Sequence, residues 1–427
     1  MLKAVWAISI CAALSACSTN KPTLDSGPML SLPQGSSFQV WMQADSADIP
    51  VTIHYWANIP SSVKYTWSGA TEADGIVVAN IENLKASTLY QYQIELGGNV
   101  LPEVYSASTL VQHYFPQTHD ISFLFGSCSW WKEDRYPLIE TMANHPADFT
   151  LWLGDNLYLD PWDHDHPGGI ASKYRKVRKH TDLKKLLASK GNVATWDDHD
   201  YGRDDATGDW PLKTEAREVF SRYWLNPSYG TEDVPGVHTQ FRISDVDFIV
   251  MDDRSYRDDP ENTPPVRMFG NDQIRWLKNM LLTSRARLKI LVSGSQWLNP
   301  LNAYEGWNRH PEEREEFLAW LAESDIPGVI FLSGDRHFTE AIKLERESTY
   351  PLYEFTCSPM TSIVLGGPEG EEKNSPYRLE GTLVVAHNYC EMKITGDKDN
   401  RVFSVKSFDE NGKENWHKQF GFSEVGL

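Results

Sequence analysis

Alternating apolar and polar positions dominate the first quarter of the chain. In the segment 89–94, Tyr90, Tyr92 and Ile94 share one face of an extended strand, and Gln91 and Gln93 share the other. Segments 37–43 and 51–56 nearly alternate, and turn residues separate them at short intervals. This pattern predicts a β-sandwich of the fibronectin III or immunoglobulin type over residues 37–112. No cluster of catalytic side chains occurs in it, so we expect a structural role.

From about residue 118 short apolar runs alternate with amphipathic helical stretches. Helices are expected at 173–189, 212–224, 272–282 and 312–322. The alternation is typical of an α/β layered domain, which we predict over residues 118–427. Residues 383–421 return to a strand pattern and are expected to complete its sheets. The chain is therefore predicted to be multidomain.

The N-terminus has the features of an export signal. Lys3 precedes a short apolar segment, 4–13, and Leu14-Ser15-Ala16-Cys17 follows it. This end resembles a bacterial lipobox, in which Cys17 is lipidated and becomes the first mature residue. The alternative is an ordinary signal peptide with an incidental cysteine.

The stretch 18–36 is rich in Ser, Pro, Thr and Gly and is predicted to be a tether. By resemblance, Ser18 favours the outer membrane over the inner one. We therefore expect a protein of the bacterial cell envelope that faces the periplasm and is attached to the membrane only through its lipid anchor.

Charge and hydropathy exclude two other classes of protein. The 59 acidic residues outnumber the 40 basic ones, giving a net charge of −19. This balance argues against a nucleic-acid-binding surface, which needs clustered Lys and Arg. No apolar run of ~18 residues follows residue 20, so no membrane-spanning helix is expected.

The cysteines divide into groups. Cys11 lies in the signal, and Cys17 is the predicted lipidation site. Cys357 and Cys390 either form a disulfide or are both buried and reduced. Cys128 then remains as the candidate for chemistry.

Six apolar runs of the predicted α/β domain end in polar or reactive residues. The runs end before 126–128, 154–158, 197–200, 252–254, 293–297 and 333–337. In α/β sheets the carboxyl ends of the strands are where sites are built. We therefore expect the Cys, Asp, Tyr and His side chains of these segments to converge on a metal site.

The residue types suit two cations. The two oxygens of Asp155 can bridge them, and Asp335 and His337, two residues apart in an extended segment, face the same way. Cys128 can supply a thiolate and Tyr158 a phenolate. Two cations ~3.5–4 Å apart would clamp the attacking and leaving oxygens of a phosphoryl displacement.

The ordered motifs resemble those of a known family. Calcineurin-like metallophosphatases carry D-x-H, GD-x-x-D, GNH-D/E and GH-x-H. The corresponding places here read Gly-Ser-Cys, Gly-Asp-x-x-Tyr, Asp-Asp-His-Asp and Gly-Asp-x-His, at 126–128, 154–158, 197–200 and 334–337. This substituted set resembles the PhoD-like alkaline phosphatase family, over roughly residues 38–421.

The resemblance implies Fe3+ and Ca2+, with Zn2+ as the alternative cation. The iron ligands it implies are Cys128, Asp155, Tyr158 and His337. For calcium it implies Asp155 and Asp335, and a further ligand after the WDDH-like motif, where relatives often carry Asn. This chain has Arg203-Asp204-Asp205 there, and we take Asp204 first and Asp198 second.

Two residues are candidates for catalysis. His199 matches the position that assists the phosphate or the leaving group. Arg336 is either a surface charge or a contact for phosphate oxygens, since it lies between Asp335 and His337.

The function expected from these residues is hydrolysis of phosphate mono- and diesters by metal-activated water. The substrates would be phosphate-ester small molecules, or substrates derived from phospholipids or nucleotides. The alternatives are a strict phospholipase D-like diesterase and a non-catalytic surface lipoprotein that binds glycans.

Overall fold

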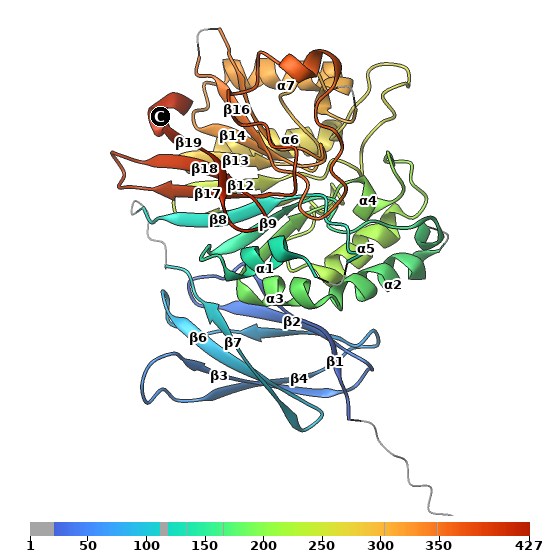
Figure 1. The fold of residues 1–427 in the computed structure, drawn as a ribbon, viewed down its shortest axis with the longest axis vertical. Coiled ribbons are helices and arrows are strands. Elements are labelled where there is room, and N and C mark those ends of the chain that lie inside the picture. The colour runs from blue at the N-terminus through green and yellow to red at the C-terminus, as the bar shows by residue number, and fades with distance from the viewer. Residues whose placement is uncertain (1–20, 112–117, 134, 165, 303, 348) are drawn as a thin grey trace, which may run out of the picture.

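A computed structural model describes residues 21–111, 118–133, 135–164, 166–302, 304–347 and 349–427. Two large β-sheets lie face to face, and helices cover the outer face of each, so the main body has four layers, α/β/β/α (Figure 1). The predicted export signal and the predicted lipidation site Cys17 lie outside the described residues. Within the described part of the chain, no helix has the length and apolar character needed to cross a bilayer.

The first large sheet has nine strands. In spatial order they are β19 (Glu414–Gly421), β18 (Val402–Phe408), β17 (Tyr389–Thr395), β8 (Ile121–Gly126), β9 (Phe149–Leu153), β10 (Gly191–Thr195), β1 (Leu24–Ser31), β2 (Phe38–Ala44) and β5 (Ile76–Ile81). The central strands β8, β9 and β10 run parallel. Strands β17 to β19 come from the C-terminal part, as the sequence pattern predicts.

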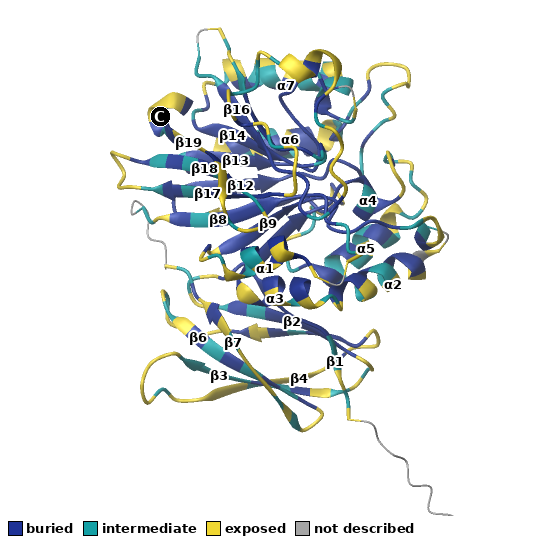
Figure 2. Ribbon diagram, in the orientation of Figure 1, coloured by how far each residue is buried: buried dark blue, intermediate teal, exposed yellow. Residues whose placement is uncertain are grey.

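The second large sheet has six strands. Their order is β11 (Thr239–Ile243), β12 (Val246–Val250), β13 (Leu288–Val292), β14 (Val329–Ser333), β16 (Leu352–Thr356) and β15 (Glu340–Leu344). Strands β12, β13 and β14 are parallel and almost wholly buried, which explains why they read as continuous apolar runs (Figure 2). The six apolar runs of the sequence therefore supply the parallel strands of two sheets.

Aromatic rings fill the space between the two large sheets. Phe123, Phe149 and Phe248 contact one another with ring centroids 5.0, 5.2 and 5.6 Å apart. Because the strands of both sheets end around this core, it fixes the relative position of the loops that follow them.

The helices cover the outer faces of the two sheets. The helices are α1 (Pro137–Asn144), α2 (Pro167–Arg178), α3 (Thr181–Ser189), α4 (Asp198–Tyr201), α5 (Lys213–Tyr223), α6 (Gly270–Thr283) and α7 (Pro311–Glu323), with short 3₁₀ turns at Pro161–His164, Trp307–Arg309, Gly370–Asn374 and Phe422–Val425. The single helix expected over 173–189 is wrong, because the chain turns at Lys179 and His180 and a new helix begins at Thr181.

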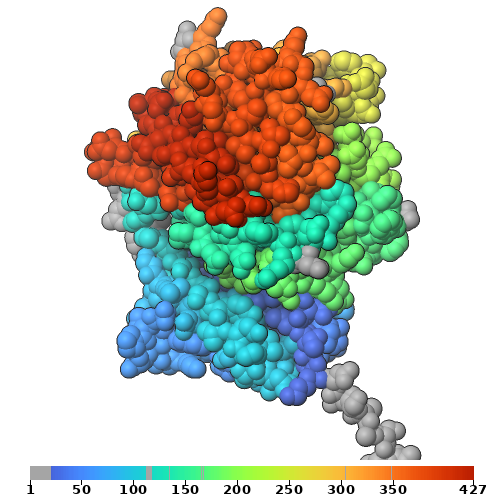
Figure 3. Space-filling view, in the orientation of Figure 1, coloured from blue at the N-terminus to red at the C-terminus, as the bar shows by residue number. Residues whose placement is uncertain are grey.

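The N-terminal strands form a second core. A four-stranded sheet in the order β4 (Tyr65–Ala70), β3 (Pro50–Ala57), β6 (Leu89–Leu96) and β7 (Asn99–Ser108) packs on β1, β2 and β5. The face of β6 predicted to be apolar is buried, with Tyr92 and Ile94 fully inaccessible. Figure 3 shows these N-terminal segments packed directly against the rest of the molecule.

The predicted tether over residues 18–36 is wrong for its central part. Strand β1 occupies Leu24–Ser31, antiparallel to β2 and parallel to β10. Met29 and Leu30 point to opposite faces of the strand, and each is buried in a different core. Burial of these two apolar side chains stabilises the strand although the residues around them have the composition of a linker. Gly27 is needed here because its φ is +92° and a Cβ would lie 2.9 Å from the carbonyl oxygen of Trp41. The two predicted domains therefore share one sheet.

Candidate metal centre

The candidate ligands follow strands whose carboxyl ends meet. Cys128 follows β8, Asp155 and Tyr158 follow β9, and His337 follows β14 of the other sheet. The thiol of Cys128 lies 3.6 Å from Oδ2 of Asp155, and the hydroxyl of Tyr158 donates to the same oxygen at 3.0 Å. The Tyr158 hydroxyl also lies 3.3 Å from Nε2 of His337. The structure thus brings together the four residues proposed as iron ligands.

The backbone at this centre adopts conformations that are unfavourable for ordinary residues. Cys128, Asp155, Asp335 and His337 have φ values of 58°, 49°, 68° and 55°. Each such residue costs on the order of 1–3 kcal/mol unless its surroundings fix it. Surrounding hydrogen bonds do so, for example from the backbone N–H of His337 to Oγ of Ser358 at 3.0 Å. Strained backbone at several adjoining positions indicates a functional site.

The His337 ring is oriented by its second nitrogen. Nδ1 lies 2.5 Å from the backbone carbonyl oxygen of Ile363. Because a carbonyl only accepts, Nδ1 carries the proton and Nε2 presents its lone pair to the cluster. Histidines that bind metals are generally held in this way.

Burial makes the charged forms of these donors unfavourable in the absence of a cation. It raises the pKa of the Cys128 thiol to about 11, with a further contribution from the charge of Asp335. The pKa values of Asp155 and Tyr158 also lie well above their usual range, first through burial and then through neighbouring acidic groups. A bound cation reverses this effect, since it favours the thiolate, phenolate and carboxylate forms. The donor set therefore fits a metal ion.

A second group of potential ligands shares Asp155 with the first. Oxygen and nitrogen atoms of Asp155, Asp198 and His199 lie within 4.8 Å of one another. Oδ1 of Asp155 accepts from the backbone N–H of His199 at 3.3 Å, whereas Oδ2 faces Tyr158 and Cys128. The two oxygens of one buried carboxylate are thus directed to two groups of donors.

Asp335 belongs to the same acidic surroundings. It lines the pocket together with Asp155 and Asp198. Burial, followed by the charge of Glu305, raises the pKa of Asp335 to about 7. A group of acids that oppose one another's ionisation is suited to a divalent cation.

The segment after α4 differs from the expectation. The Asp204 side chain is 83% exposed and lies 3.5 Å from Nε2 of His199. Asp205, which our sequence analysis did not choose, has φ of 58° and donates its backbone N–H to Oδ2 of Asp198 at 2.8 Å. Burial and then the charge of Glu305 raise the Asp205 pKa to about 7. The sequence carries no signal that separates these adjacent aspartates.

Arg336 is held by protein groups. Its guanidinium pairs with buried Glu372 at 2.6 Å and donates to Oδ1 of Asn302 at 2.7 Å. The rings of Tyr304 and Phe338 lie 5.0 Å from it. Arg336 is therefore not the surface charge considered as one alternative; it lines the pocket with both terminal nitrogens engaged.

A buried ion network that the sequence analysis missed supports the N-terminus of α4. Arg254, after β12, is fully buried and pairs with Asp197 and, at 2.8 Å, with Glu305. Asp197 is the N-cap of the helix that carries Asp198 and His199. Nothing in the local sequence links Arg254 to Glu305, because 51 residues separate them.

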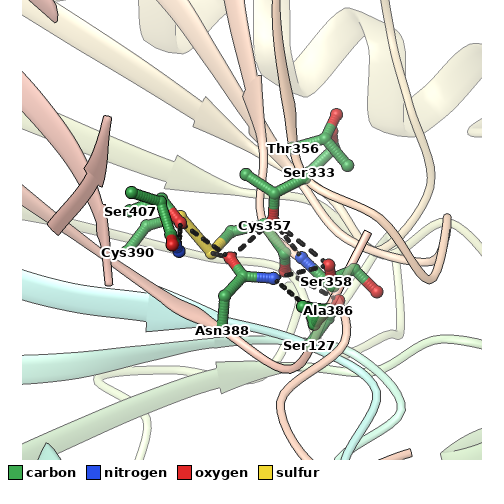
Figure 4. Close-up of a disulfide and its surroundings, with 11 residues drawn as sticks. Ser127, Ser333, Thr356, Cys357, Ser358, Ala386, Asn388, Cys390 and Ser407 are labelled. Atoms are coloured by element: carbon green, nitrogen blue, oxygen red, sulfur yellow. Dashed lines mark hydrogen bonds between the residues drawn. A yellow bond between two sulfur atoms is a disulfide. The ribbon is translucent and has the colours of Figure 1, made fainter. Parts of the chain in front are cut away.

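A disulfide lies beside the Cys128 loop. Cys357, after β16, is bonded to Cys390 of β17, so the pairing left open by the sequence is the correct alternative (Figure 4). Oγ of Ser127 donates to the carbonyl oxygen of Cys357 at 3.1 Å. Among the described cysteines Cys128 alone is free, as expected for a candidate ligand.

The candidate metal centre opens into a pocket of about 680 Å³, which Asp155, Asp198, Asp335 and His337 line. His199 is partly exposed at its wall and packs against Tyr158 with the rings tilted and their centroids 4.2 Å apart. Trp130 stacks on Tyr158 at 5.1 Å. The Tyr158 ring therefore has aromatic neighbours that restrict its orientation.

The layers and the position of the site define the class of fold. The structure of PhoD superposes with a TM-score of 0.74 and 20% identity, covering 91% of this chain and 86% of that one. Purple acid phosphatase PPD1 from yellow lupin (Lupinus luteus) seeds superposes with a TM-score of 0.67 and 10% identity, covering 96% and 76%. The fold is a metallophosphatase-type α/β fold, as predicted.

The family follows from the sequence match. The model of the PhoD-like phosphatase family matches residues 123–403, and the chain belongs to this family. Alkaline phosphatase D of Bacillus subtilis (strain 168) is 24% identical over 361 residues, which is 71% of this chain. The match spans 59% of the length of that relative. The family resemblance given by the motifs is thereby confirmed.

Proposed function

We propose that the protein is a metal-dependent phosphoesterase, an alkaline phosphatase or phosphodiesterase that hydrolyses phosphate mono- and diesters. The observation that carries this proposal is the position of Asp155, whose two oxygens face two groups of buried or half-buried donors. Membership of the PhoD-like phosphatase family supports the same reaction. A glycan-binding module has no need for a buried thiol, phenol and carboxylate held on strained backbone.

The first group of donors would hold Fe3+. A thiolate, a phenolate, an imidazole and a carboxylate surround one point, from Cys128, Tyr158, His337 and Asp155. Zn2+ is the alternative, because thiolate and imidazole also suit it. The second group would hold Ca2+ through Asp155, Asp198 and Asp335, since carboxylates are its usual ligands. We favour Asp205 over Asp204 beside them, because the Asp205 backbone binds Asp198 and its carboxyl interacts with Glu305, whereas the Asp204 side chain is 83% exposed.

When bound, these cations would activate water and offset charge on the phosphoryl oxygens. The chain's own residues would bind and orient the ester. His199 opens onto the pocket and is suited to assist the leaving oxygen. Arg336 would stabilise the wall of the pocket, because its terminal nitrogens bind Glu372 and Asn302. It is therefore not proposed to bind phosphate oxygens directly.

The N-terminal two-sheet unit is proposed to be a fibronectin III-like or immunoglobulin-like sandwich with a structural role. We also propose that Cys17 is lipidated and that the lipid anchors the protein in the bacterial outer membrane, where the protein faces the periplasm. With β1 beginning at Leu24, the six residues 18–23 allow a span of at most about 20 Å. Cys17→Ser should move the protein from the membrane fraction to a soluble or unprocessed pool. Unchanged fractionation would contradict the anchor.

Hydrolysis of p-nitrophenyl phosphate and of its bis ester tests the reaction. The wild-type protein should release p-nitrophenolate from both, and Asp155→Asn should lower both rates by at least about 100-fold, because even the loss of a group that only supports a metal ligand typically costs about 10–100-fold. Asp272→Asn, an exposed carboxylate on α6, is the matched control and should retain the rate. An Asp155→Asn rate within a few-fold of the control would contradict the proposal.

A further inference from the structure

Exposed apolar side chains gather at one side of the pocket. Two chain segments contribute them, 363–365 and 383–385. We call the group the apolar rim; its members and their exposed fractions are Ile363 (53%), Val364 (40%), Leu365 (52%), Leu383 (39%) and Val385 (39%). Exposed apolar residues that adjoin one another in this way mark binding surfaces more often than single ones do.

The apolar rim is attached directly to the candidate metal centre. The carbonyl oxygen of Ile363 accepts from Nδ1 of His337, and Leu365 lines the same pocket as Asp155. The second segment pairs with the chain just after His337, through the bridge between Val384 and Thr339. A group held at the centre would therefore lie beside the rim.

The two segments of the rim also contact each other. A Cβ placed on Gly367 would lie 2.9 Å from Cγ2 of Val385, and Nε2 of His387 donates to the carbonyl oxygen of Ser362 at 2.7 Å. In the second segment Val384 packs toward the core, whereas Leu383 and Val385, on either side of it, are exposed. The rim is thus a continuous surface built on fixed backbone.

The lining of the pocket combines carboxylates with apolar side chains. Asp155, Asp198 and Asp335 line it, and so do Leu365 of the rim and Tyr304, which are 52% and 60% exposed. A purely polar phosphate ester would leave that apolar surface in contact with water. An ester with a hydrocarbon chain would cover it while its phosphoryl group lay over the carboxylates.

We propose that the apolar rim binds the alkyl or acyl chain of an amphiphilic phosphodiester substrate. This inference rests on the proposed function and names its substrate class. In the reaction, the oxygen of water forms a bond to phosphorus and the bond from phosphorus to the leaving oxygen breaks. A proton from the attacking water is released to the leaving oxygen or to solvent, so no further reactant is required.

Three p-nitrophenyl phosphodiesters that differ only in their second group test the proposal. Methyl, butyl and octyl esters keep the same leaving group, so a difference in kcat/KM reports the chain rather than the chemistry. Each methylene group that the protein buries fully should raise kcat/KM by a factor of about 4, and a methylene only partly buried on a rim should raise it less. We expect wild-type kcat/KM to rise at least about tenfold from the methyl to the octyl ester, measured below the micellar concentration.

Substitutions on the rim should remove this preference. In Leu365→Ser/Val385→Ser the octyl-to-methyl ratio should fall at least about fivefold, because each serine replaces apolar contact surface. Ile59→Ser/Val63→Ser removes two apolar side chains that are more exposed than those of the rim, 59% and 64% accessible, near the β3–β4 connection, and should keep the wild-type ratio. The proposal would be overturned if the wild type showed no chain-length preference, or if the octyl-to-methyl ratio fell equally in both double variants.

A binding measurement separates this proposal from the proposed function. Calorimetry on the holoenzyme should give a lower Kd for octylphosphonate than for methylphosphonate, and the difference should disappear in Leu365→Ser/Val385→Ser. If no ester is hydrolysed but this binding difference is found, the proposed function fails and the rim is supported. If the esters are hydrolysed without any effect of chain length, the proposed function is supported and the role of the apolar rim fails.

Discussion

The hydroxyl of Tyr158 donates a hydrogen bond to Oδ2 of Asp155 at 3.0 Å, and the other oxygen of that carboxylate faces the backbone of His199. One buried side chain thereby joins two groups of donors that come from different loops. Both groups should therefore depend on Asp155, whereas each of the other residues should affect mainly its own group.

Substitution of Asp155 should weaken both metals together. Asp155→Asn removes the charge and one strong oxygen donor, so the contents of both metals should fall, whereas Asp335→Asn should lower mainly calcium. Elemental analysis of the purified variants measures this directly. If Asp155→Asn retains both metals at the wild-type ratio, Asp155 is not the bridge.

Colour should report the metal beside Cys128. A thiolate and a phenolate donate electron density to Fe3+ in visible light, so protein grown with ample iron should be coloured, whereas Zn2+ has a filled shell and would leave it colourless. Tyr158→Phe should shift or weaken the absorption band and keep the fold, because Trp130 and His199 still pack against the ring. Cys128→Ala should also lower the iron content.

An absorption spectrum recorded beside elemental analysis decides between these ions. A colourless, fully active protein with stoichiometric zinc and no iron would contradict the ferric assignment. The phosphoesterase proposal would survive that result.

The Arg254 network should contribute strongly to stability. Arg254→Met leaves Asp197 buried without its ion-pair partner and leaves Glu305 with Arg257 alone, at 3.5 Å; breaking a buried pair costs about 3–5 kcal/mol in the free energy of unfolding. Arg275→Ala, which breaks an exposed pair with Asp272, should cost less than about 1 kcal/mol. Urea unfolding followed by tryptophan fluorescence gives both values, and equal losses would contradict the role of the network.

Acid should destabilise the protein partly through His310. Burial, and then the charge of Arg257, lowers the pKa of His310 from 6.5 to about 4. The unfolded chain therefore takes up this proton first, and stability falls as the pH falls from about 6.5 to about 4, by up to about 3 kcal/mol. His310→Gln can still donate to the carbonyl oxygen of Asp258 and should lose less over this window.

The free energy of unfolding should be measured by urea unfolding as a function of pH in the wild type, His310→Gln and His417→Gln. The wild type and His417→Gln, which changes an exposed histidine, should show the same decline. A decline in His310→Gln as steep as theirs would show that another group is responsible.

Much of the α/β body is predictable from sequence, because buried parallel strands read as apolar runs and polar or reactive residues follow each run at its carboxyl end. The candidate ligands Cys128, Asp155 and His337 follow such runs. Strand β1 was missed because its buried pair, Met29 and Leu30, is short and the composition around it is that of a linker.

Other parts of the site depend on contacts that no local pattern contains. Arg254 and Glu305 meet only after two loops fold together, and Arg336 finds Glu372 from 36 residues away. The choice between Asp204 and Asp205 depends on a single left-handed backbone position. These features are set by tertiary packing rather than by periodicity.

The central claim is that hydrolysis requires the metals held around Asp155. The most direct measurement is the rate of p-nitrophenyl phosphate hydrolysis against metal content in the same samples, through stepwise chelation and dialysis. We expect the rate to fall with metal content to the level of the Asp155→Asn variant, and added Ca2+ to restore a large part of it where iron remains bound. Full activity in a sample whose metals are verified to be absent would contradict the claim.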